Sequence, residues 1–460
     1  MYPRMLFAGT LVLAAQLSAL CAEDLSEYAA IRKETHAHSQ ARDYPAMERS
    51  ARRLCEFTRA ATDTDHRRIG EAKIQLVAAL IGQGRYAEAE PLLKETLTRY
   101  ERELGPETVD TAAVLNTLGY LYCRMGRVRE AEPLLVKGLE IREKTLGPTH
   151  FATAISLSRL ADLYFLVGRL SEAEASCMRA LAILEDVDEE VDRGENRART
   201  LEILAKTQEV EGHFAEAEAR YRQSLGITEK SLGSEHPALV TPLNGLAVLL
   251  EHEARYAEAE ILYRRVLGIV ERTFGTEHFK TAAIVNNLAH LYRVQERYDE
   301  AEPLQLRAVA IARKTLGPDH PDTAATINCL ARLYAAQGRY ADAEPLYHEA
   351  LTLAEKIFGP EHRNLGTSCN CLAELYRAQG RNDEAERYYT RALAIREKAL
   401  GPEHRDTAET LRGLGELYQA QGRTAEAEPF LQRAKAIEDK RSKPQAKPEA
   451  GQPPQSRLPN

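Results

Sequence analysis

Asparagine recurs at one place along this chain, and its spacing is regular. The residues are Asn116, Asn244, Asn286, Asn328 and Asn370, and the last four are separated by steps of 42 residues. Asparagine is a poor helix former, but its amide offers both a hydrogen-bond donor and an acceptor. If the segments that carry these residues stack side by side, the asparagines form a column. Such a column can pair with the backbone N–H and C=O groups of an extended peptide.

Histidine also recurs, and six histidines in one pattern raise the question of a metal site. The residues are His150, His236, His278, His320, His362 and His404. Zinc ligands must converge to about 2.0–2.1 Å from a single ion, whereas residues one repeat apart in a stack are separated by a whole helix pair. We therefore expect these histidines to form loop hydrogen bonds or helix caps, and we expect no metal site and no cofactor.

No catalytic motif is found in the sequence. The chain lacks a Gly-x-x-x-x-Gly-Lys phosphate loop, a His-Glu-x-x-His zinc motif and a Gly-x-Ser-x-Gly nucleophile turn. His404-Arg405-Asp406 matches a kinase triplet, but Leu411 occupies the place of the asparagine that this motif requires. We therefore predict that the protein is not an enzyme and that it has no catalytic residues.

The segments that position these residues repeat with the same period. A turn sequence such as Gly338-Arg339-Tyr340 recurs nine times at 42-residue steps, except for one step of 44 between Gly168 and Gly212. In the unit around Gly338, apolar residues are spaced by three or four on both sides of the turn, which predicts two helices. Self-similarity at a fixed period is typical of a solenoid. The fold class is therefore predicted to be all-α.

Composition is compatible with such an array and excludes one class of partner. The 460 residues are 44% hydrophobic and 28% charged, as in ordinary folded proteins. The net charge of −8 and the isoelectric point near 6.0 argue against a nucleic-acid-binding surface over the whole chain. We therefore expect a protein or peptide partner and no nucleic acid.

The repeated unit resembles the tetratricopeptide repeat. Leu330-Ala331, Tyr334, the turn glycine Gly338 and Ala343 stand at the places of that family's pattern. The 42-residue period and the Leu-Gly-Pro-Asp-His loop at residues 316–320 are most similar to the kinesin light chain type. The resemblance covers residues 66 to 441. It implies a right-handed superhelical solenoid of antiparallel helix pairs, about ten in number.

The resemblance implies that the asparagine position faces a concave, peptide-binding groove. In an alternative interpretation, each amide ties one helix to its neighbour by side-chain hydrogen bonds. The column is interrupted by Ser158 and Glu202 and ends at Arg412. The C-terminal half of the chain is therefore the expected location of the binding site.

Further groove residues are expected four and seven positions after the asparagines in that half. These residues are His290, Arg332 and Glu374 at the first position, and Arg293 and Arg377 at the second. With Arg412, the arginines would form a basic stripe suited to an acidic side chain or a terminal carboxylate. The alternative is a solvated charged face.

Residues 1–22 are predicted to be a signal peptide. A short basic start is followed by the apolar run 5–20, and cleavage is expected after Ala22. The run is shorter than the roughly 20 apolar residues that span a membrane. One alternative is lipid attachment at Cys21, although Leu20 stands where that motif has a small residue. An uncleaved anchor is a further alternative.

The rest of the chain is expected to divide into five parts. Residues 23–65 form a degenerate capping helix pair, and residues 66–187 form a first repeat block. Residues 188–193 form an acidic irregular joint where the stack can bend. Residues 194–441 form a second block, and residues 442–460, rich in Lys, Pro and Gln, form a disordered tail.

These features predict an exported, non-enzymatic scaffold that binds a protein or an extended, acidic peptide in its groove. Export, to a periplasm or out of the cell, departs from kinesin light chains, which act with a motor in the cytosol, so no motor partner is carried over. After cleavage of the signal peptide no membrane span is expected. Two alternatives remain: a self-assembling structural or envelope-complex component, and an accessory subunit that binds a non-peptide ligand.

Overall fold

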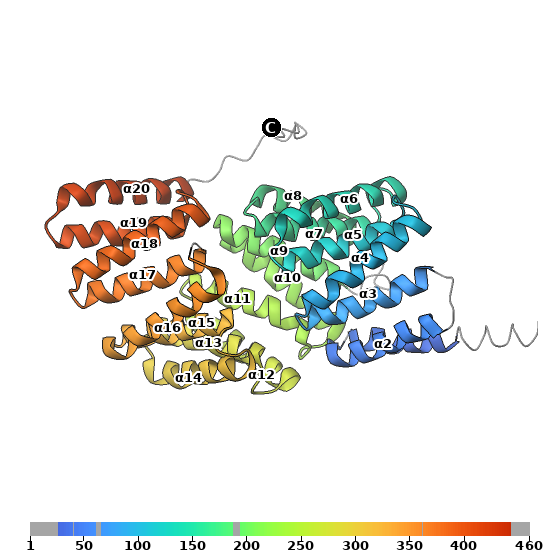
Figure 1. Cartoon of the computed structure of the whole chain (residues 1–460), viewed down its shortest axis with the longest axis horizontal. Helices are drawn as coiled ribbons and strands as arrows, with labels where there is room; N and C mark the ends of the chain where they lie inside the picture. The colour runs from blue at the N-terminus through green and yellow to red at the C-terminus, as the bar shows by residue number, and fades with distance from the viewer. Residues whose placement is uncertain (1–25, 40, 61–65, 187–193, 361, 443–460) are drawn as a thin grey trace, which may run out of the picture. The chain divides into compact units, whose positions relative to one another are not determined.

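In a computed structural model of the protein, residues 26–39, 41–60, 66–186, 194–360 and 362–442 are described, and every regular element among them is a helix (Figure 1). They belong to two compact units, Met1–Ile269 and Val270–Asn460. The predicted signal peptide, the joint at 188–193 and residues 443–460 of the predicted tail lie outside the described residues. The predicted all-α repeat solenoid is confirmed.

Each repeat is a helix A, a tight turn and a helix B that packs against helix A. In unit 1 the first pair consists of residues 26–39 and α2 (Tyr44–Ala60). The next pairs are α3 (His66–Gly82) with α4 (Tyr86–Glu103), α5 (Val109–Arg124) with α6 (Val128–Leu146), α7 (Phe151–Leu166) with α8 (Leu170–Glu185), and α9 (Glu195–Glu211) with α10 (Phe214–Leu232). The short η1 (Pro237–Leu239) leads into α11 (Val240–His252), which is followed by α12 (Tyr256–Phe274).

The division between the units falls within α12, after Ile269. The pairs of unit 2 are α13 (Phe279–Val294) with α14 (Tyr298–Thr315), α15 (Pro321–Ala336) with α16 (Tyr340–Phe358), α17 (Arg363–Ala378) with α18 (Asn382–Leu400), and α19 (Arg405–Ala420) with α20 (Thr424–Ser442). In unit 1, α8 and α9 pack together on either side of the predicted joint. The two additional residues of that step therefore do not separate the repeats that they connect.

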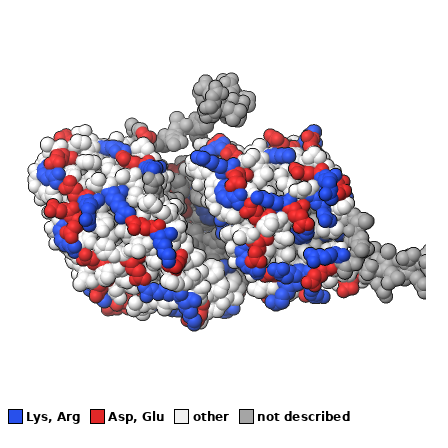
Figure 2. Space-filling model, viewed as in Figure 1, with Lys and Arg blue, Asp and Glu red and all other residues white. Residues whose placement is uncertain are grey.

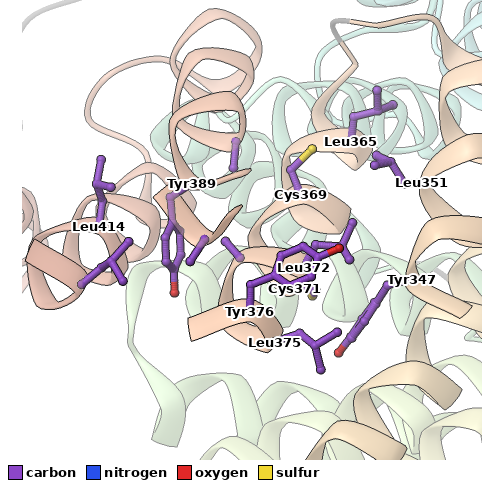
Figure 3. Close-up of a cluster of buried hydrophobic side chains, with 14 of the residues drawn as sticks. Tyr347, Leu351, Leu365, Cys369, Cys371, Leu372, Leu375, Tyr376, Tyr389 and Leu414 are labelled. Atoms are coloured by element: carbon purple, nitrogen blue, oxygen red, sulfur yellow. The ribbon is translucent and has the colours of Figure 1, made fainter. Parts of the chain in front are cut away.

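Apolar side chains at the predicted places build the core of each unit. In unit 2, Tyr347, Leu372, Tyr376, Tyr389 and Leu414 belong to one buried cluster that joins successive repeats (Figure 3). From α4 onward, the alanine at the start of each helix B is fully buried, as at 343 and 385, because helix A approaches closely there; α2 has Met47 at this place. Burial of this kind is the main stabilising contribution in a stack whose repeats contact only their neighbours.

The turn between helix A and helix B requires a left-handed backbone conformation. Gly338 has φ +74°, and the next N–H, that of Arg339, donates to the carbonyl of Tyr334 at 2.9 Å. This arrangement is a common helix C-terminus, and it favours glycine. Three turns carry other residues in the same conformation: Arg42 at φ 53°, Ala254 at φ 58° and Glu296 at φ 59°.

An arginine after most of the turns links a repeat to the preceding one; His213 takes its place before α10. The guanidinium of Arg339 lies 4.0 Å from the ring centroid of Tyr334 in its own helix A. It also donates to Glu302 of the preceding helix B at 3.0 Å and to Asp342 at 2.9 Å. The same set of contacts recurs around Arg127, Arg169, Arg381 and Arg423. Accordingly, basic and acidic side chains alternate over the visible face of each unit (Figure 2).

The recurrent histidines cap the A helices, as predicted. In each of the six loops the histidine Nδ1 accepts the backbone N–H of the second following residue, at 3.0–3.3 Å. Because only an unprotonated Nδ1 can accept this bond, each cap requires a neutral imidazole. Among the described residues no group of three or more His, Cys, Asp or Glu side chains could hold a metal ion.

We predict that Ala254→Gly stabilises the protein. An L residue in the left-handed conformation costs about 1–2 kcal/mol, whereas glycine mainly loses about 0.5–1 kcal/mol of unfolded-state entropy. The Ala254 side chain is exposed, so little packing is lost. The melting temperature, followed by circular dichroism, should rise, and Gly338→Ala as the converse control should lower it. An unchanged or lower melting temperature for Ala254→Gly would contradict this account.

We predict that His278 makes stability depend on pH. Burial, followed by the charge of Lys280, lowers the pKa of His278 below its ordinary value of about 6.5. The native state therefore favours the neutral ring. Its contribution is complete above the unfolded pKa and is lost as the pH falls through the lower folded pKa. Protonation would also place a cation at a helix N-terminus, where the helix dipole disfavours positive charge.

The variant His278→Asn supplies a cap that does not titrate. As the pH falls from about 7.5 to 5, the free energy of unfolding of the unaltered protein should decrease relative to that of this variant. Urea unfolding at each pH measures that difference. A difference that stays constant over this range would show that His278 is not the titrating cap.

Candidate functional site

In unit 2 the predicted asparagine column lies on adjacent A helices. Asn286 is on α13, Asn328 on α15 and Asn370 on α17, and each of these helices packs against the next A helix in the order. In unit 1, Asn116 on α5 and Asn244 on α11 are separated by the helices α7 and α9. The structure therefore brings three of the five asparagines into one row.

Two asparagines are buried and bonded within the stack. Asn370 is 3% exposed, and its Oδ1 accepts a hydrogen bond from Thr410 on the next A helix at 3.1 Å, while its Nδ2 donates to Glu374 at 2.8 Å. Asn116 is 4% exposed and donates to Ser156 on its next A helix at 2.7 Å. Ser156 and Thr410 hold the same place in their repeats, so the two amides make equivalent helix-to-helix ties.

The other asparagines are only half-buried. Asn286 accepts a hydrogen bond from Gln305 Nε2 at 2.8 Å. The Nδ2 of Asn328 lies 4.0 Å from Cys371 Sγ, and its Oδ1 has no hydrogen-bond partner among the described residues. Asn244 is half-buried in unit 1. The amide oxygens of Asn286 and Asn328 therefore lie within the stack, one bonded to Gln305 and the other buried.

The residues expected four and seven positions after the asparagines line that face. Arg332 and Glu374 are exposed, whereas His290, Arg293 and Arg377 are half-buried. His290 Nε2 and Arg293 Nη2 are 3.0 Å apart. One hollow lies between α13 and α15, and it is lined by Ala289, His290, Arg293, Gln305, Cys329, Arg332 and Leu333. The residues that face this hollow come from both of the helices that carry Asn286 and Asn328.

The predicted basic stripe is not uniformly positive. Arg377 pairs with Glu416 at 2.6 Å, and Arg412 pairs with Glu438 at 3.2 Å. Glu374 takes the place that Arg332 holds one repeat earlier. Although the residue is exposed, neighbouring side chains partly desolvate its carboxylate, and this desolvation, followed by the charge of Glu409, raises its pKa. Arg332 has no ion pair among the described residues. Positive charge on this face is therefore concentrated around Arg332 and Arg293.

A second charged cluster, in unit 1, was outside the predicted set. Tyr120 holds the repeat place of Arg332, and the guanidinium groups of Arg159 and Arg199 lie over its ring. Each residue alone resembles an ordinary surface residue. The asparagine column predicts a binding site in the C-terminal half and not at this cluster. An aromatic residue at the Arg332 position, followed by arginines in the next two A helices, is the pattern that could have indicated this cluster.

No helix in the described part of the chain is both long and apolar enough to cross a membrane. A sequence model of the tetratricopeptide repeat matches residues 68–144, 110–186, 196–272 and 367–439. A second model of the same repeat matches residues 281–322 and 323–364. Together these matches cover most of the chain. No curated protein sequence matches it.

Solved structures are similar to the chain over its helical region. Nearly identical TPR-like repeats from a kinesin light chain of Podosopora anserina are 31% identical, covering 45% of this chain and 97% of theirs, with a TM-score of 0.39. The apo form of RapI is 14% identical and covers 81% of this chain and 98% of its own, with a TM-score of 0.57. A Rap protein complexed with competence and sporulation factor is 18% identical, with 82% and 99% coverage and a TM-score of 0.56.

The likeness to the Rap proteins, at these identities, concerns the fold alone. The repeat matches extend over both units and coincide with the helix pairs described above. The turn glycines, the buried alanines and the 42-residue period are those of one repeat class. The chain therefore belongs to the tetratricopeptide repeat family, and its repeats are similar in sequence to those of a kinesin light chain.

Proposed function

We propose that the protein is an exported, non-enzymatic adaptor that binds an acidic segment of a partner protein on the A-helix face of unit 2. The tetratricopeptide fold is typical of protein-binding scaffolds. The observation that carries the proposal is the hollow lined by His290, Arg293 and Arg332, in which Arg332 has no ion pair among the described residues.

The chemistry of this hollow suits a carboxylate. A guanidinium can donate two parallel hydrogen bonds to a carboxylate, and such charge-assisted bonds are stronger than neutral ones. The contact between Arg293 and His290 holds a second cation at the same hollow. Asn286 and Asn328 lie on the same two helices, where their Nδ2 groups can donate to the backbone carbonyls on either side of the acidic residue.

We predict that Arg332→Glu weakens binding of an acidic peptide by about tenfold or more, because a charge-assisted hydrogen bond contributes about 1.5–3 kcal/mol. The probe is the tightest-binding peptide selected by the unaltered protein from a displayed library. Fluorescence anisotropy measures the dissociation constant. Arg412→Gln is the matched control, since Arg412 is already paired with Glu438, and it should change the constant little.

Two outcomes would contradict this proposal. One is selection of peptides that carry no acidic residue, and the other is unchanged affinity in Arg332→Glu. The double variant Asn286→Ala/Asn328→Ala tests the amides separately, because it leaves the charge of the face unchanged. It should weaken binding of the same peptide while the preference for acidic residues persists. Equal affinity in the double variant would leave the asparagines with a role in packing only.

Export is supported by residues 1–22, whose basic start, apolar run and small residues fit a signal peptide. We predict that the protein expressed in a bacterial host is found outside the cytoplasm and begins at Glu23. Intact-mass spectrometry of the recovered chain measures this directly. A mass increased by a lipid on Cys21 would identify a lipoprotein, and a full-length chain in the cytoplasm would contradict export.

A further inference from the structure

A cluster of arginines surrounds Tyr120 in unit 1, apart from the site proposed in unit 2. The guanidinium carbon of Arg159 lies 3.8 Å from the centroid of the Tyr120 ring, and that of Arg199 lies 4.9 Å from it. Contacts of this kind are cation–π interactions. Two guanidinium groups therefore contact the same aromatic ring.

Three successive A helices build this cluster. Tyr120 and Arg124 are on α5, Arg159 is on α7 and Arg199 is on α9, and these helices pack side by side. Arg124 is exposed one turn after Tyr120, while Tyr120 and Arg159 are half-buried beneath it. The arrangement is part of the rigid stack, so the positions of the guanidinium groups are set before any ligand arrives.

The positive charge of this cluster is not balanced. Asp162 pairs with Arg199 at 3.6 Å. Glu202, one turn after Arg199, also feels its charge, but burial raises the pKa of Glu202 and so favours its neutral form. Three arginines therefore face one ion-paired aspartate, which leaves an excess of two positive charges. Burial, followed by the charge of Arg199, lowers the pKa of Arg159 to about 10. The charges of all three arginines also lower the pKa of Tyr120, although burial acts to raise it.

Arg159 has an unmet hydrogen-bonding capacity as well. Its Nη1 is buried and has no hydrogen-bond partner among the described residues. A desolvated cation without a carboxylate partner is costly to fold. Buried polar groups of native proteins are usually paired, so an exception of this kind calls for a functional explanation. An anion that enters the cluster would supply the missing negative charge.

We propose that Tyr120, Arg124, Arg159 and Arg199 form a binding site for a phosphate dianion. A phosphate monoester carries about −1.5 to −2 charges at pH 7 and three acceptor oxygens, which matches the excess of two positive charges. A carboxylate would balance only half of it. Guanidinium forks bind phosphate oxygens in bidentate geometry, and the phenol of Tyr120 adds a donor. Inorganic phosphate and a phosphorylated side chain share this chemistry.

Isothermal titration calorimetry on the full chain tests the proposal. The probes are inorganic phosphate and two short peptides of one sequence, one with phosphoserine and the other with glutamate at the same position. The unaltered protein should bind both phosphate probes, and the glutamate peptide about tenfold more weakly or not at all. Arg159→Gln and Arg199→Gln should each weaken phosphate binding about tenfold or more.

Asp162→Asn makes the test independent of folding defects. It removes the negative charge that competes with the ligand, so it should tighten phosphate binding several-fold, which a misfolded protein cannot do. Arg332→Gln, in unit 2, should leave phosphate binding unchanged, and the cluster variants should leave acidic-peptide binding in unit 2 unchanged. The two sites can therefore fail independently.

The outcomes separate the sources of the ligand. Tighter binding of the phosphoserine peptide than of inorganic phosphate would identify a phosphorylated protein, and equal affinity would identify free phosphate. The proposal is overturned if the unaltered protein binds neither phosphate probe, if the glutamate peptide binds as tightly as the phosphoserine peptide, or if Asp162→Asn does not tighten binding.

Discussion

The close approach of helix A to helix B is the constraint on which the other features of each repeat depend. Buried alanines such as Ala343 and Ala385 permit this approach, and large apolar residues such as Leu372 and Tyr389 fill the space around it. Because each repeat covers its apolar face only with its neighbours, a change at one alanine affects two interfaces. The turn conformation follows from the same constraint, since helix B must reverse within a few residues to reach helix A.

The turn arginines then link one repeat to the next. Five of them combine a ring contact within their own repeat with an ion pair to the preceding one, as Arg339 does with Tyr334 and Glu302. Single ion pairs at a surface contribute little stability. Repeated along a stack, however, they favour one arrangement of neighbouring repeats over shifted ones. A uniform arrangement is what allows side chains one period apart to form rows.

These rows divide into structural and functional positions. The asparagine row is partly used for packing, as Asn370 and Thr410 show, whereas the row four residues later is exposed at Arg332 and Glu374. The two units fill that second row differently. Unit 2 places a guanidinium there, and unit 1 places Tyr120, which gathers arginines from the following helices. The same scaffold thus presents arginine clusters of different composition on its two units.

Local patterns were enough to predict the fold, because helix periodicity, turn glycines and capping histidines depend on residues close to one another in the chain. The family resemblance also predicted which positions of each repeat form the surface rows. It did not reveal which of their members are already paired: Arg377 is paired by Glu416, 39 positions away, and Arg412 by Glu438 on the next helix. Nor did it reveal the cluster at Tyr120. Those outcomes depend on which side chains neighbouring helices bring within hydrogen-bonding distance, so only the packed stack defines them.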